Sequence, residues 1–153
     1  MSRRLPPQLA AQLIALGQRY GLDQLGLDDD GEVVLSFDDG IEIGLACFGP
    51  LSDLRLYCDV GALPARPEPQ LLIELLQFNR VDADPDGAVI GLTDDDPPRM
   101  LAAQRVDWRG LTVTDFVATA EAFVDLVEDL HALCRESASA APGLLPGTMN
   151  LRG

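Results

Sequence analysis

Apolar residues recur every three or four positions in three segments of the chain, a spacing that places side chains on one face of an α-helix. The first helix is predicted over residues 8–21, ending at Gly21, a residue type that commonly ends helices. Its apolar face consists of Leu9, Leu13, Leu16 and Tyr20. The last helix is predicted to begin after Thr112, which forms a helix-start motif with Asp115, and to end near Arg135.

The middle helix, predicted over the segment LLIELLQFNR at residues 71–80, has too many apolar positions for a single core. At about 100° per residue its apolar side chains cover an arc of roughly 220°, whereas one core needs a stripe of about 100°. We expect one face to pack on its own sheet and the other on a second copy of the chain. Burial of both faces within one subunit is the alternative. The predicted dimer-interface residues are Leu72, Leu75, Leu76, Phe78 and Trp108.

Apolar and polar residues alternate in the segments between these helices, which is the pattern of strands with one buried face. Three strands are predicted over residues 32–37, 41–47 and 54–60, with turns at 38–40 and 49–53. After a turn at 82–87, two more strands follow over residues 88–93 and 100–108. The order of helix, three strands, helix, two strands, helix predicts an α+β fold with an antiparallel sheet. We expect a single domain over residues 1–135 and a disordered tail over 136–153, which is rich in Ala, Ser, Gly and Pro.

The charge and composition of the chain narrow its function. A net charge of −14 in 153 residues argues against binding to nucleic acid or to an anionic membrane, because both would repel it. All 11 basic residues are arginine, so Schiff-base lysine chemistry and a lysine-containing phosphate loop are excluded. The three cysteines are too scattered for a disulfide framework or a zinc site, and buried free thiols fit a reducing cytoplasm.

The candidates for chemistry do not form a catalytic or metal-binding set. The acidic clusters at 28–30 and 94–96 lack the spacing of a calcium loop and are typical of solvated turns. His131 is the only histidine, and Cys134 lies three residues from it on the same helix, a poor geometry for nucleophilic attack. We therefore expect no enzyme activity, no metal and no cofactor. The surplus apolar surface instead indicates a protein that binds other proteins.

Four stretches of the sequence resemble a known family: VVLSFDDGIEIGLACFGP, LLIELLQFNR, GAVIGLTDDD and DWRGLTVTDFVATAEAFVDLVEDL. They are similar to the class I chaperones of bacterial type III secretion, the Tir-chaperone family, over about residues 5–135. Two features depart from the family pattern: the first helix begins with two prolines, and the tail is longer than the pattern requires.

The resemblance implies a cytoplasmic, virulence-associated homodimer that binds the N-terminal region of one secreted effector. The effector segment would wrap around the dimer in extended form and be handed to the secretion ATPase, with no nucleotide used by the chaperone. The first helix and the three-strand meander would supply the effector-binding surface. Its predicted residues are Leu9, Leu13, Leu16, Val34, Phe48 and Tyr57, the last three being off the apolar phase of their strands. The alternative function is a non-catalytic dimeric adaptor or regulator that binds a folded protein partner.

Overall fold

The computed structural model describes residues 4–48, 53–79 and 87–150, with side chains described up to residue 136. The predicted order of elements is confirmed, with one short 3₁₀-helix, η1, added before the last helix. The elements are α1 (Pro7–Arg19), β1 (Glu32–Ser36), β2 (Glu42–Cys47), β3 (Leu54–Ala62), α2 (Pro69–Phe78), β4 (Val89–Leu92), β5 (Arg99–Val106), η1 (Trp108–Gly110) and α3 (Val113–Asn150). The predicted turns at 49–53 and 82–87 lie almost entirely outside the described residues.

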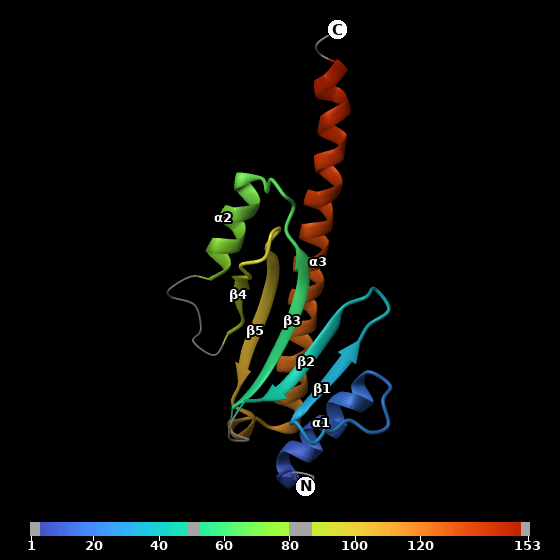
Figure 1. The fold of residues 1–153 in the computed structure, drawn as a ribbon. Helices are drawn as coiled ribbons and strands as arrows, with labels where there is room; N and C mark the ends of the chain where they lie inside the picture. The colour runs from blue at the N-terminus through green and yellow to red at the C-terminus, as the bar shows by residue number, and fades with distance from the viewer. Residues whose placement is uncertain (1–3, 49–52, 80–86, 151–153) are drawn as a thin grey trace.

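The strands form one antiparallel sheet in the order β1-β2-β3-β5-β4, which confirms the predicted α+β class (Figure 1). β1, β2 and β3 are joined in sequence, and the β4–β5 hairpin attaches through β5 to β3. The sheet therefore has two edges, β1 at one end and β4 at the other. α2 lies beside β4, far from β1 (Figure 1).

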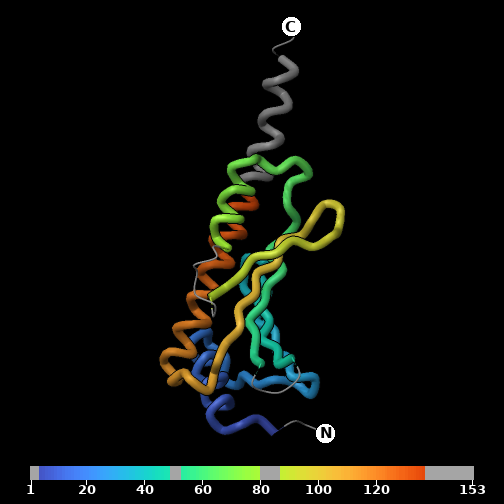
Figure 2. The backbone as a smooth tube through the Cα atoms, turned by 90° about the vertical axis from the view of Figure 1, so that its left-hand side faces the viewer, coloured from blue at the N-terminus to red at the C-terminus, as the bar shows by residue number. Residues whose placement is uncertain are grey.

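The core lies between one face of the sheet and the helices α1 and α3 (Figure 2). Across this inner face the register aligns Leu35 with Ile43, Ile43 with Cys58 and Cys58 with Ala102, all of them buried. The apolar alternation in the sequence thus predicted the buried face of these strands correctly. Phe116, Phe123 and Val127 of α3 are among the fully buried side chains that cover it.

α1 is fixed to the core at both of its ends. At its start, Gln8 Nε2 donates to Trp108 O at 3.1 Å. One turn later, the buried Gln12 Nε2 donates to Trp108 O at 2.8 Å and to Leu111 O at 2.9 Å, and together these bonds tie α1 to the turn before α3. At its end, Gly21 has φ 75° and Leu22 N–H donates to Gly17 O at 2.8 Å, so the chain leaves the helix in the left-handed conformation that favours glycine. The predicted start of the last helix is also confirmed, because Asp115 N–H donates to Thr112 Oγ1 at 3.1 Å.

α3 extends further than the sequence indicated. Its end was predicted near Arg135, whereas the backbone is helical to Asn150. The apolar stripe that predicted the helix ends near Arg135, and the sequence beyond it contains two Pro-Gly pairs at 142–143 and 146–147, which disfavour a helix, so no sequence signal predicted the extension. The division into a domain over 1–135 and a tail over 136–153 stays a prediction.

Candidate functional site

Two titratable residues of the described chain, Asp28 and Cys58, have clear structural roles. Asp28 Oδ1 accepts hydrogen bonds from the N–H groups of Asp30 and Glu32 at 2.9 and 3.0 Å, so this carboxylate closes a turn. Burial, with smaller contributions from Asp59 and Glu42, raises the pKa of the Cys58 thiol to about 11 and keeps it un-ionised at neutral pH. Across the described part of the chain, no group of three or more His, Cys, Asp or Glu residues is placed to hold a metal ion. None of the helices in that part is long and apolar enough to cross a bilayer.

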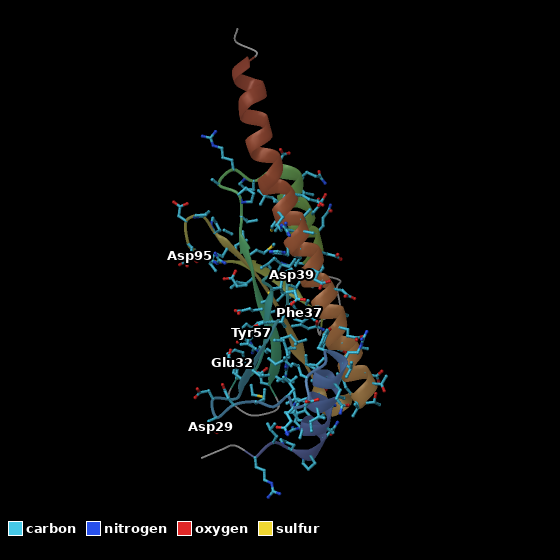
Figure 3. All side chains as sticks on the ribbon, turned by 90° about the vertical axis from the view of Figure 1, so that its right-hand side faces the viewer. Asp29, Glu32, Phe37, Asp39, Tyr57 and Asp95 are labelled. Carbon is cyan, nitrogen blue, oxygen red and sulfur yellow. The ribbon has the colours of Figure 1, made fainter. Side chains whose placement is uncertain are left out.

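The outer face of the sheet, away from α3, carries a row of small and apolar residues. The register places Val34, Gly44, Tyr57, Ala103 and Val89 side by side across all five strands. The ring of Tyr57 lies directly over Gly44, because a Cβ added at Gly44 would be only 2.1 Å from the Tyr57 Cζ. Figure 3 shows Tyr57 and Glu32 on this side of the sheet, opposite the long helix. Val34 ends the row at the β1 edge and is 49% exposed.

A groove of about 470 Å³ runs along the β1 edge, between that strand and the end of α1. Its lining is formed by Tyr20, Leu22 and residues 34–38. The Tyr20 and Phe37 rings meet edge to face, with centroids 5.4 Å apart, and form one wall. Burial, with the nearby Glu121, raises the pKa of Tyr20, so its hydroxyl remains a hydrogen-bond donor well above neutral pH.

The main chain of β1 is open to this groove over a short span. Cys47 N–H donates to Gly31 O, and Phe37 N–H donates to Ile41 O, so the odd-numbered residues of β1 face β2. The even-numbered residues therefore direct their N–H and C=O groups away from the sheet. Both main-chain groups of Glu32 are already hydrogen-bonded to the Asp28 turn. Asp28 N–H donates to Glu32 O, and Glu32 N–H donates to Asp28 Oδ1. Val34 and Ser36 remain as the residues whose main chain faces the groove.

A second apolar surface lies over α2 and β4. Leu71 and Leu75 face the core, whereas Leu76 is 74% exposed and Leu92 on β4 is 50% exposed. A groove of about 410 Å³ between the two elements is lined by Leu72, Leu75, Leu76, Asn79, Ile90, Gly91 and Leu92. Ile73 and Phe78 add further exposed apolar area on α2. We call this region the α2–β4 surface.

The loop end of the outer face carries the predicted residue Phe48. Phe48 is more than half exposed, and the Arg55 Cζ lies over its ring, 5.3 Å from the ring centroid. Arg55 in turn donates to Asp53 at 3.0 Å, and this hydrogen bond lowers the pKa of Asp53. Arg105 is also 3.7 Å from Asp53, so the two arginines that face each other on β3 and β5 share one carboxylate.

The structure separates the sequence-predicted dimer residues into two groups. Leu72, Leu76 and Phe78 lie at the α2–β4 surface, so their role in a dimer stays a prediction. Trp108 is buried in the core of the single chain, and this part of the expectation is corrected. Leu75 is also largely buried, but it lines the groove of the α2–β4 surface, so its role in a dimer stays a prediction. Leu75 lies on the core-facing side of α2, and the backbone carbonyl of Trp108 is held by Gln12. Trp108 cannot reach a second chain without unpacking the fold.

The predicted effector-binding residues divide in the same way. Leu9, Leu13 and Leu16 are each 0% exposed, so they belong to the core and not to an accessible binding surface. Their regular helical spacing could not show whether α3 or a partner covered them. Val34, Phe48 and Tyr57 do lie on the outer face, where their strand phase placed them, and their binding role stays a prediction.

Some residues of these surfaces were not predicted from the sequence. Leu22 lines the β1 groove and Leu92 the α2–β4 surface, and both are exposed. Leu22 follows the helix-ending Gly21, which was a usable signal, because an apolar residue placed after a helix stop often packs back on that helix. Leu92 has the same strand phase as the buried Ile90, so the two-residue alternation of β4 predicts a core position and does not reveal that Leu92 is exposed.

The comparisons with known proteins agree with this architecture. A sequence model of the Tir chaperone protein (CesT) family matches residues 12–131, which is most of the chain. A chain of the ExsC–ExsE complex superposes with a TM-score of 0.66 at 24% identity, covering 86% of this chain and 97% of that one. The Yersinia pestis type III secretion chaperone SycH, solved with a fragment of YscM2, gives a TM-score of 0.62 at 18% identity, covering 79% and 98%.

A third solved structure, the ExoT–SpcS complex from Pseudomonas aeruginosa, gives a TM-score of 0.55 at 19% identity, covering 82% of this chain and 98% of the matched one. A search of curated proteins gave no match. At these identities the solved structures establish a common fold, and the family match rests on the sequence model.

Proposed function

The chain belongs to the Tir chaperone protein (CesT) family of type III secretion chaperones, and from this premise we propose how it holds a secreted effector. The chain acts in the cytoplasm as a homodimer, and it binds an extended segment from the N-terminal region of one effector. It binds without catalysing a reaction and without a cofactor. The observation that carries the proposal is the groove at the β1 edge, where an open main chain and exposed apolar side chains occur together.

An extended segment can satisfy both features of this groove at once. A strand added beside β1 would pair its main chain with the outward N–H and C=O groups of Val34 and Ser36. Its alternate side chains would then point toward α1 on one side and toward the outer face on the other. On the α1 side they would contact Tyr20 and Leu22, and on the outer side they would contact Val34. Main-chain pairing supplies affinity for many sequences, and the groove selects apolar side chains.

The α2–β4 surface supports the homodimer. Within the described residues nothing covers Leu76, so its apolar area faces solvent in the single chain. A two-fold contact would place this surface against its own copy, which buries the exposed leucines of α2 and β4 on both sides. The two surfaces lie at opposite edges of the sheet, so a dimer formed in this way leaves both β1 grooves accessible to an effector.

The test is co-expression with a candidate effector encoded beside this chain, followed by titration with the effector's N-terminal segment. Val34→Pro removes the outward N–H of β1 without removing a hydrogen bond to β2, so it should weaken binding by about tenfold or more. Val34→Thr is the matched control, because it keeps the N–H and the branched shape and should bind nearly as well as the wild type. Equal binding by Val34→Pro and Val34→Thr would exclude strand addition at β1. It would favour the alternative, an adaptor for a folded partner.

A further inference from the structure

The side chain of Asn79, the residue that ends α2, is hydrogen-bonded to the outer edge of β4. Its Nδ2 donates to the carbonyl oxygen of Ile90 at 2.5 Å, and the N–H of Ile90 donates to its Oδ1 at 2.9 Å. The backbone N–H of Asn79 donates to Leu76 O at 3.2 Å, which holds the residue at the end of the helix. The Asn79 side chain thus forms hydrogen bonds with both the N–H and the C=O group of Ile90.

The alternation of β4 shows that these two groups belong to the outward edge. Thr93 N–H donates to Arg99 O on the β5 side, so residues 89, 91 and 93 face β5. Ile90 and Leu92 therefore direct their main chain away from the sheet. β4 has four residues, Val89–Leu92, and Asn79 closes one of its two outward positions. A single open residue cannot form the repeated pairs that an added strand needs.

The primary amide of asparagine contains one carbonyl oxygen and two N–H donors, so it can present to a strand the same pair of groups as a peptide unit. We propose that Asn79 is a one-residue substitute for a neighbouring strand that closes the β4 edge. The sheet then accepts an added strand only at β1. Natural sheets commonly protect their edges, since an open edge pairs with other strands without selecting among them.

This inference extends the proposed function, because it explains why an effector segment would join β1 and not β4. The two edges differ in the described structure itself. The β1 edge has an adjacent groove and two outward residues with no cap, whereas the β4 edge is closed at its centre and lies beside the leucines of α2. Without the cap, the open edge of one molecule could pair with the same edge of another, and the protein would assemble through its sheets.

The experiment measures amide exchange at Ile90 by NMR and assembly by sedimentation velocity, and it uses the full chain without an effector. In Asn79→Ala we expect the Ile90 amide to exchange about tenfold faster than in the wild type, because its acceptor is lost. We also expect species larger than the wild-type assembly, which grow with concentration. The amide of Cys47, which donates to Gly31 O in the β1–β2 region, reports on overall stability and should be unchanged.

Two further variants separate a cap from a general stabilising contact. Gln77→Ala removes an exposed amide two positions earlier on α2 and should leave both measurements at wild-type values. Asn79→Asp keeps the oxygen that accepts from Ile90 N–H but loses the donor, so exchange should stay within about threefold of the wild type. Unchanged exchange at Ile90 in Asn79→Ala would overturn the cap. Faster exchange without larger assemblies would overturn its role in blocking strand addition.

These outcomes are independent of effector binding at β1. A failure of the effector to bind at β1 would not alter the exchange at Ile90. A failure of Asn79→Ala to open the β4 edge would leave the result of Val34→Pro intact.

Discussion

α1 and α2 are both rich in leucine, yet the fold covers them differently. The leucines of α1 at positions 9, 13 and 16 are 0% exposed, enclosed between the sheet and α3. α2 buries Leu71 and Leu75 and leaves Leu76 in solvent at 74% exposure. α1 is a closed part of the core, whereas α2 is an open surface at the edge of the sheet. The comparison teaches that the width of an apolar arc, more than the number of apolar residues, indicates whether a helix needs a second partner.

The different surroundings of the two helices explain their difference in burial. α1 lies against α3, and Gln8 and Gln12 both donate to the carbonyl oxygen of Trp108. α2 has ten residues, and its contacts are mainly with β4, to which Asn79 attaches its end. Changes in α1 should therefore affect folding, and changes on the outer side of α2 should affect assembly.

The largest expected effect is on the stability of the fold and comes from a change in the buried face of α1. Leu13→Ala should lower the free energy of unfolding by about 2–5 kcal/mol, because it leaves a cavity in a fully enclosed site. Urea unfolding at a fixed protein concentration would measure this change. Ile14→Ala is the control: Ile14 is the next residue on the helix and is exposed, so its loss should cost about 0.5 kcal/mol. Equal costs for the two variants would show that α1 is not enclosed as described.

The next effect is on the dissociation constant of the proposed homodimer and comes from a change in the exposed face of α2. Leu76→Asp should weaken the homodimer by about 2 kcal/mol, or roughly thirtyfold in dissociation constant, because it places a charge in an apolar contact. Sedimentation equilibrium over a dilution series would measure the dissociation constant, and circular dichroism would show that the fold is retained. Gln77→Asp adds the same charge one residue away and serves as the control. If Leu76→Asp remained as dimeric as Gln77→Asp, the α2–β4 surface would not be the dimer contact.

The smallest effect is a pH dependence of the stability of the fold, which arises from a buried thiol on β3. The thiol of Cys58 has a pKa raised from 9.0 to about 11 in the folded chain, so the unfolded chain loses this proton first as the pH rises. The stability contributed by the protonated thiol is complete below about pH 9 and is lost between pH 9 and 11, by at most about 1.4 kcal/mol per pH unit. Urea unfolding at pH 8 and pH 10 should show a larger loss for the wild type than for Cys58→Ala. Parallel losses would contradict the burial of this thiol.

Much of the fold could be predicted from the sequence, because its signals are local. The two-residue alternation identified the inner faces of β1, β2 and β3, including Ile43 and Cys58. Thr112 with Asp115 marked the start of α3. The end of α3 could not be predicted in the same way, because the apolar stripe ends before the helical backbone does.

Less of the candidate site could be predicted. The strand phase placed Val34 and Tyr57 on the outer face, and the wide arc of α2 indicated its open side. The positions of Leu13 and Trp108 were misjudged, because an apolar side chain looks the same in the sequence whether a neighbouring element or another molecule covers it. The β1 groove brings Tyr20, which follows α1, next to Phe37, which follows β1, and no local pattern links these two rings.

The sequence by itself determined the order of the main helices and strands, which side of β1, β2 and β3 is buried, and that lysine chemistry is absent. Hydrogen bonding within a helix and the alternation of a strand act over a few residues, so their patterns can be seen directly in the chain. Only the tertiary structure decided which edge of the sheet is open. Asn79 and Ile90 lie eleven positions apart, and Tyr20 and Phe37 seventeen. Their contacts depend on how α1 and α2 pack at opposite edges of the sheet, which no short stretch of sequence encodes.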